Sequence, residues 1–300
     1  MMTESDLTAV MYDTIVVPTD GSEHAIRAAE HGYALARLFD ATVHVLNVVT
    51  MPDTVGTVND ELLGHLEQQG AEAVEAVEAV AGAGVPVETA VVRGQPARGI
   101  VDYVDDHDAD LVAMGTHGRT GLERYVEGSV TERVVRMADV PVLTTRETEA
   151  SDVDDDYDEI LLPTDGSDPA AAAVDHAFAV AERADARVHA VNIVDIGSIA
   201  VSPGFVHPTE VLDRLESEGE RATQAVADRG RSDGVEVVTE VREGYASNDL
   251  LDYADDNGID LITMGTHGRT GFERYILGST TTRIVRQAEA PVLAIKANEQ

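Results

Sequence analysis

Two glycine-rich stretches carry the residue types best suited to holding a ligand. The eight residues MGTHGRTG occur at Met114–Gly121 and again at Met264–Gly271. The longer stretch Gly115–Ser129 has the skeleton G-x2-G-x9-G-S, and a helical pattern follows it. Glycine lets the backbone approach a ligand closely or adopt a positive φ. The free N–H groups at the amino end of a helix favour phosphate. The sequence therefore predicts a phosphate-binding loop, present twice.

The spacing separates this loop from two better-known phosphate loops. A Walker A loop needs G-x4-G-K-[ST], and neither copy has the lysine. A dinucleotide fingerprint has G-x-G-x-x-G directly after a first strand, which is not the order found here. Hydroxyl groups at Ser129 and Thr131, and at Ser279 and Thr281 in the second copy, can add hydrogen-bond donors to the backbone amides.

The loop belongs to a repeat of about half the chain, as expected for a duplicated domain. YDTIVVPTDGS (Tyr12–Ser22) matches YDEILLPTDGS (Tyr157–Ser167), and the matching pieces follow in the same order in both halves. The acidic stretch Glu147–Glu159 lies between the copies and has the composition of a solvated linker. We therefore expect one domain over 1–148 and a second over 157–300.

Each half alternates short apolar runs with helical patterns. TIVVP precedes a helical pattern that can be capped by Ser22, and TVHVLNVV follows as a β-branched strand. Strict alternation predicts an α/β fold, namely two tandem doubly wound sheets of five parallel strands in the order 3-2-1-4-5. Ligands bind such Rossmann-like sheets beyond the carboxyl ends of the strands, where the strand order reverses. The repeated segments TDGS and MGTHGRTG follow the first and fourth predicted strands, which is where this fold holds a ligand.

Composition restricts the partners and the environment. The chain has 56 acidic and 21 basic residues, a formal net charge of −35, and a single lysine, Lys296. Such a surface repels nucleic acid and anionic membranes, and it is typical of proteins adapted to high salt. The chain has no cysteine, no long apolar stretch that could span a bilayer, and an amino-terminal stretch unlike a secretory signal. We expect a cytoplasmic protein from a halophilic host, with no membrane or nucleic-acid partner.

Both halves resemble universal stress protein domains, of the subgroup whose G-x2-G-x9-G-[S/T] motif binds ATP. The resemblance covers nearly the whole chain twice and implies an adenine nucleotide alpha hydrolase-like fold. It implies that the strand-1 aspartate lies against the nucleoside, that the residue near the end of strand 2 contacts adenine through its backbone, and that the motif glycines and serine contact ribose and phosphate. The expected nucleotide-binding residues of the first half are Pro18, Thr19, Asp20, Val48, Met114, Gly115, His117, Gly118, Arg119, Gly128, Ser129, Val130 and Thr131. Those of the second half are Pro163, Thr164, Asp165, Ile193, Met264, Gly265, His267, Gly268, Arg269, Gly278, Ser279, Thr280 and Thr281. His117 and His267 depart from a position that is often basic in the family, which makes phosphate binding there pH-dependent.

Several of these residues also have purely structural interpretations. Asp20 can satisfy the TDGS turn, and Ser129 and Ser279 can cap helices. Arg119 and Arg269 can pair with nearby acids. A further set of histidines lacks metal-ligand spacing and is interpreted as structural or exposed, namely His24, His31, His44 and His189.

The preferred function is a stress-response or signalling module that binds ATP or a related adenine nucleotide in each half, with Mg²⁺ held by the phosphates as an optional companion. The alternative is a slow nucleotide hydrolase or phosphotransferase that uses the same pockets. Phosphoryl transfer needs strong charge stabilisation, and the loops offer no lysine. His24 is matched by Pro169 in the second copy, so no Ser–His pair is shared. Binding without catalysis is therefore favoured.

The fifth strands suggest how the halves associate. Both are strongly apolar, and exposed apolar edges pair readily. In the resembling family, dimers form through this strand. We expect 140–145 to pair with 291–296 across a pseudo-two-fold axis, which gives an intrachain pseudo-dimer and leaves further homo-oligomerisation open.

Overall fold

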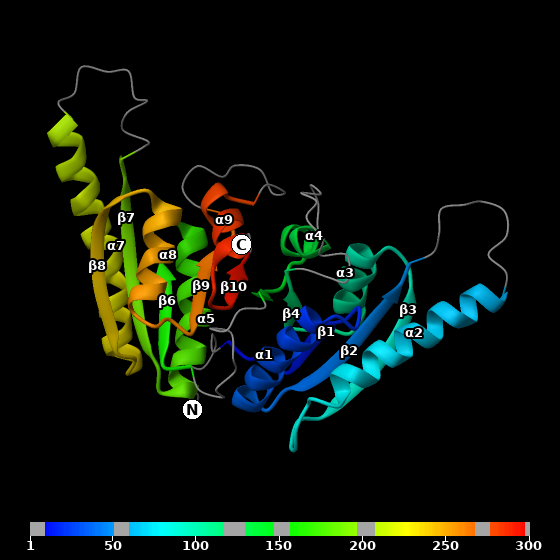
Figure 1. Ribbon diagram of the computed structural model, residues 1–300. Coiled ribbons are helices and arrows are strands. Elements are labelled where there is room, and N and C mark those ends of the chain that lie inside the picture. The colour runs from blue at the N-terminus through cyan, green and yellow to red at the C-terminus, as the bar shows by residue number, and fades with distance from the viewer. Residues whose placement is uncertain are drawn as a thin grey trace. The chain divides into compact units, whose positions relative to one another are not determined.

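The computed structural model describes residues 10–50, 60–116, 130–146, 157–196, 208–267 and 277–297. Apart from Val10, they belong to two compact units, one within Met11–Asp155 and the other within Asp156–Gln300. Within the described residues each unit alternates strands and helices (Figure 1).

The N-terminal unit is a parallel sheet with helices on both faces. Its elements are β1 (Thr14–Pro18), α1 (Glu23–Phe39), β2 (Thr42–Val49), α2 (Asp60–Glu78), β3 (Val87–Arg93), α3 (Pro96–Asp106), β4 (Leu111–Gly115), α4 (Val130–Met137) and β5 (Val142–Thr145). The strands lie in the order β3-β2-β1-β4-β5, and every neighbouring pair is parallel. This is the 3-2-1-4-5 order predicted from the alternation.

The C-terminal unit repeats that topology. Its elements are β6 (Glu159–Pro163), α5 (Asp168–Ala184), β7 (Arg187–Asp195), α7 (Pro208–Asp233), β8 (Val237–Gly244), α8 (Ala246–Asp256), β9 (Leu261–Gly265), α9 (Ser279–Gln287) and β10 (Val292–Ile295). Its order, β8-β7-β6-β9-β10, is again 3-2-1-4-5 when counted within the unit.

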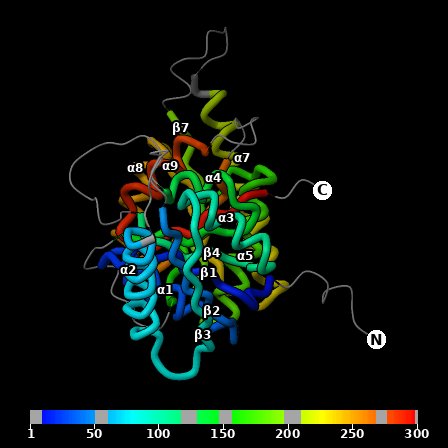
Figure 2. The backbone as a smooth tube through the Cα atoms, turned by 90° about the vertical axis from the view of Figure 1, so that its right-hand side faces the viewer, coloured from blue at the N-terminus to red at the C-terminus, as the bar shows by residue number. Residues whose placement is uncertain are grey.

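The central strands are apolar on both faces because helices cover both faces of the sheet. Ile15, Val16 and Val17 of β1 have no exposed surface, and neither have Leu161 and Leu162 of β6. In the N-terminal unit α1 and α2 lie together on one side of the strands (Figure 2), and α3 packs against α4. Among the described helices, none combines the length and apolar character that a bilayer crossing requires.

The first helix of each unit begins at a matching serine. Ser22 caps α1, its side chain accepting a hydrogen bond from the Ala25 amide at 3.2 Å, as the sequence predicted. Ser167 caps α5 in the same way through the Ala170 amide. These caps place each helix directly after the TDGS turn, so that its amino end lies at the carboxyl edge of the sheet.

Candidate functional site

The first and fourth strands of each unit separate before they reach the carboxyl edge of the sheet. β1 and β4 are in register only through Ile15–Leu111 and Val16–Val112. β6 and β9 likewise pair only through Ile160–Leu261 and Leu161–Ile262. The strand order reverses here, which is where doubly wound sheets bind ligands.

One side of this site is the TDGS turn. The Thr19 hydroxyl accepts a hydrogen bond from the Gly21 amide at 3.0 Å, and the Asp20 carboxylate accepts one from the Ser22 amide at 3.0 Å. The second copy repeats both contacts at Thr164 and Asp165. The structural role of the aspartate, satisfying the turn, is therefore present in both units. The turn also holds each carboxylate just beyond the end of the strand.

An asparagine, half-buried in the N-terminal unit and buried in the C-terminal unit, holds the same turn from the neighbouring strand. The Asn47 amide on β2 donates to the Thr19 carbonyl at 2.7 Å, and Asn192 on β7 donates to the Thr164 carbonyl at 2.7 Å. The asparagine fits because a glycine of the overlying helix faces it. A Cβ on Gly70 of α2 would lie 2.5 Å from the Asn47 side-chain oxygen, and one on Gly219 of α7 would be closer still to Asn192.

Sequence reasoning missed these positioning residues. The signal was an asparagine at the sixth position of TVHVLNVV and of RVHAVNIV, together with a glycine inside each long helix. A polar residue in a buried strand and a glycine in a helix interior both lower stability unless packing requires them.

The other side of the site is the end of the fourth strand. A Cβ on Gly115 would lie 2.8 Å from the His24 carbonyl oxygen, and one on Gly265 would lie 2.6 Å from that of Pro169. These glycines are therefore required for the close approach of α1 and α5 to β4 and β9.

The threonines of the motif also act on these glycines. The Thr131 hydroxyl donates to the Gly115 carbonyl at 2.7 Å, and Thr281 donates to Gly265 at 2.9 Å. A hydroxyl has one proton to donate. In this structure the proton expected to be donated to a phosphate is donated to a backbone carbonyl instead. The two threonines thereby fix the start of α4 and of α9 against the strand.

The amino end of α9 is described in the C-terminal unit. Gly278 is its N-cap, and the Gly278 amide donates to the Thr266 carbonyl at 2.9 Å. Ser279 is therefore the first helical residue, and its interpretation as the N-cap is wrong. The amides of Ser279, Thr280 and Thr281 have no intrahelical acceptor, because they belong to the first turn. His267 follows Thr266, and its Nδ1 lies 2.9 Å from the Thr266 hydroxyl.

The end of the second strand extends past the end of the first. Pro18 lies beside Leu46, so Val48 is two residues beyond β1. The Val48 side chain faces α3, because a Cβ on Gly99 would lie 2.9 Å from its Cγ1. Ile193 packs against the core of the C-terminal unit. Both side chains are used in packing, which leaves the backbone of these residues for the adenine contact that the resemblance implies.

The remaining predicted residues fall in two groups. Pro18 and Pro163 end β1 and β6, Met114 and Met264 are buried in β4 and β9, and Val130 opens α4. A second group lies outside the described residues, namely His117, Gly118, Arg119, Gly128, Ser129, Gly268 and Arg269.

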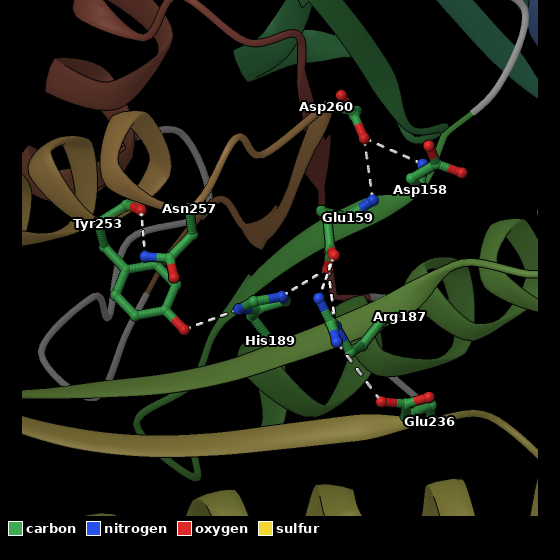
Figure 3. Close-up of polar contacts among 8 residues, drawn as sticks. All are labelled: Asp158, Glu159, Arg187, His189, Glu236, Tyr253, Asn257 and Asp260. Carbon is green, nitrogen blue, oxygen red and sulfur yellow. Dashed lines mark hydrogen bonds and ion pairs between the residues drawn. The ribbon is translucent and has the colours of Figure 1, made fainter.

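A polar cluster occupies the opposite, amino edge of the C-terminal sheet (Figure 3). His189 lies 2.7 Å from the Tyr253 hydroxyl through Nδ1 and 2.6 Å from Glu159 through Nε2, and Arg187 binds the same carboxylate. Burial favours a higher pKa for Glu159, but the hydrogen bonds from Arg187 and His189 lower it overall. The Asp260 carboxylate accepts from the Asp158 and Glu159 amides and so holds the amino end of β6 beside β9.

In the N-terminal unit the matching histidine has different neighbours. His44 Nδ1 lies 3.2 Å from the Tyr103 hydroxyl, and Nε2 lies 3.7 Å from Glu88. His107 stacks on Tyr103 with the ring centroids 3.8 Å apart. Burial lowers the pKa of His44, Glu88 opposes that shift, and His107 adds to it. Within the described ranges no group of three or more histidines and acids could hold a metal ion.

Comparison with known proteins gives one family for both units. The family model described as the universal stress protein family matches residues 11–146 and again 156–296. A universal stress protein of Methanocaldococcus jannaschii is 37% identical over 140 residues, which cover 47% of this chain and 82% of that protein. One from Mycolicibacterium smegmatis is 26% identical over 293 residues, covering 94% of this chain and 96% of the relative. A solved universal stress protein from Archaeoglobus fulgidus has the same fold, with a TM-score of 0.72 at 21% identity, over 96% of this chain and 98% of that one.

Proposed function

The chain belongs to the universal stress protein family, and we propose that each of its two units binds one adenine nucleotide, ATP or a close relative, in a stress-response or signalling role. The observation that carries the proposal is the arrangement at the carboxyl edge of each sheet. There the first and fourth strands have separated, and the first strand leads into the TDGS turn while the fourth ends in a glycine.

The chemistry of these residues fits a nucleotide. The Asp20 and Asp165 carboxylates are acceptors suited to ribose hydroxyls. The α9 amides beginning at Ser279 are donors suited to phosphate, and the helix dipole adds to their effect. Gly115 and Gly265 let the first helix of each unit pack against the end of the fourth strand, which places the TDGS turn beside that strand end. In this proposal Mg²⁺, when present, is held by the phosphates.

Binding without turnover is the favoured function. The Thr131 and Thr281 hydroxyls already donate to backbone carbonyls, and the glycine-rich loops contain no lysine to stabilise a transferring phosphoryl group. The alternative, slow hydrolysis or phosphoryl transfer in the same sites, predicts release of inorganic phosphate at a rate proportional to the number of intact sites.

Titration calorimetry with ATP tests the proposal. We expect two sites in the wild type, one site in Gly118→Val and in Gly268→Val, and none in the double variant. Gly64→Ala is the control, because its Cβ would meet nothing within 4 Å. Two sites remaining in either single loop variant would contradict the proposal. Mass spectrometry of the freshly purified protein identifies any nucleotide that is retained.

A further inference from the structure

An open groove with a volume of about 470 Å³ lies between α5 and α7 of the C-terminal unit. Its floor is apolar and is formed by Val174 of α5 and Ala222, Ala225 and Val226 of α7. Its volume falls within the range of about 300–1,000 Å³ that is usual for small-molecule sites. A groove of this size and lining can hold the hydrocarbon part of a small ligand.

Two arginines line the groove, but only one of them is available to a ligand. Arg229 pairs with Asp175 at 2.9 Å and with Asp233 at 2.7 Å, and its guanidinium lies 5.9 Å from the centre of the Phe178 ring. Arg221 is exposed, and no described residue forms an ion pair or a hydrogen bond with it.

The acidic residue of the lining also forms an ion pair with another residue. Glu218 pairs with Arg214 at 3.3 Å. Arg229 faces two aspartates, so these paired groups carry one excess negative charge, and Arg221 brings the groove close to neutral. Arg221 is the guanidinium of the lining that has no such pairing among the described residues, and it lies beside an apolar floor. A ligand with a single negative charge matches Arg221, whereas a polyphosphate would bring several further negative charges to a groove that is close to neutral in a strongly acidic chain.

The duplicated N-terminal unit lacks these features at the matching positions. The helices align through Ser22 and Ser167, which cap α1 and α5, and through Gly70 and Gly219, which face the asparagines. With this alignment Ala171, Arg221 and Arg229 of the groove correspond to Ile26, Glu72 and Val80. The N-terminal unit thus has a larger side chain in place of an alanine and an acid in place of the free arginine.

We propose that the α5–α7 groove is a second binding site, which meets the proposed nucleotide site only at Thr164, for a small amphipathic carboxylate, with the hydrocarbon part on the alanine and valine floor and the carboxylate on Arg221. A planar guanidinium binds a carboxylate through two parallel hydrogen bonds, and burial of the hydrocarbon part supplies the remaining affinity. Thr164 and Gly166 also line the groove, so the bound ligand lies beside the TDGS turn of the C-terminal unit.

Octanoate is the test ligand. We measure how it displaces the fluorescent anion ANS (anilinonaphthalene sulfonate) from the intact chain at constant ionic strength. Two variants copy residues that the same fold already carries in the N-terminal unit. Arg221→Glu should weaken octanoate binding by about tenfold or more, because a charge-assisted pair is replaced by repulsion. Ala171→Ile should abolish binding by filling the groove. Circular dichroism melting verifies that both variants are folded.

Two controls separate this site from general charge effects. Arg231→Glu makes the same charge change on the same helix, at a residue paired with Asp228 and outside the groove, and should leave binding unchanged. Octanol, which lacks the charge, should bind equally to the wild type and to Arg221→Glu. The proposal is overturned if octanoate shows no saturable binding to the wild type, or if Arg221→Glu and Ala171→Ile bind it as the wild type does. ATP titration of the same variants reports separately on the nucleotide sites.

Discussion

Replacing Gly219 by alanine should destabilise the C-terminal unit, although alanine is the better helix former. In a helix interior the exchange of glycine for alanine contributes about 1 kcal/mol of stability. At Gly219, however, the new Cβ would overlap the Asn192 side-chain oxygen and would lie 2.9 Å from its Cγ and 3.2 Å from Val241 Cγ1. The asparagine must therefore move away from the Thr164 carbonyl, to which it donates at 2.7 Å.

The magnitude follows from the groups involved. Leaving a buried polar group without its partner costs about 1–3 kcal/mol. Crowding a packed interior costs about 1–3 kcal/mol more. After the gain in helix propensity, the net loss is about 1–5 kcal/mol in the free energy of unfolding.

The assay is chemical unfolding in constant molar KCl, followed by circular dichroism, with calorimetry to separate the transitions of the two units. Gly64→Ala in α2 is the matched control and should be stabilising by up to about 1 kcal/mol, since no atom lies within 4 Å of its Cβ. In an Asn192→Ala background, Gly219→Ala should cost little, which gives a coupling energy of at least about 1 kcal/mol. A Gly219→Ala protein as stable as Gly64→Ala would refute the reasoning.

Three further predictions concern pH, salt and assembly. Burial, opposed by Asp175, lowers the pKa of His176 from 6.5 to about 4, so the unfolded chain binds more protons between these values. The free energy of unfolding should therefore fall by up to about 3 kcal/mol as the pH drops from 6.5 toward 4. In His176→Gln the free energy of unfolding, measured with urea at each pH, should depend less steeply on pH, and the same pH dependence as in the wild type would contradict this. Lowering KCl from molar to millimolar should lower the melting temperature, because it restores repulsion within a net charge of −35, and a constant melting temperature would argue against salt adaptation. After proteolysis at the acidic linker, the two halves of the wild type should stay together on gel filtration, and the two halves of the double variant Val142→Asp, Val292→Asp should separate. Separation of the wild-type halves would disprove the predicted pairing of the fifth strands.

The strand order and the first helix caps could be predicted because each rests on a local pattern. Apolar runs such as TIVVP predict buried parallel strands, and Ser22 precedes a stretch with apolar residues at helical spacing. The duplication supplied a second instance of each pattern. The order 3-2-1-4-5 follows from right-handed crossovers once the alternation is recognised.

The contacts that position the site could not be predicted in the same way. Asn192 and Gly219 belong to different elements, and only the packing of α7 on β7 brings them together. The structural role of Thr281 could not be predicted for the same reason. Its hydroxyl is able to bind a ligand or a carbonyl, and only the packing of α9 against β9 brings the Gly265 carbonyl within hydrogen-bond distance.

The short pairing between the first and fourth strands has a thermodynamic consequence. In the N-terminal unit, β1 and β4 are joined at their amino ends, where Asp110 accepts from two β1-side amides, and they share only two register pairs before they separate. A ligand that contacts both strand ends closes this opening and stabilises the folded unit by an amount that grows with the logarithm of its concentration. The two units have separate openings. A chain loaded in one unit would therefore carry one protected and one unprotected half, distinguishable by the rate at which the amides beside β1 and β6 exchange their hydrogens with solvent.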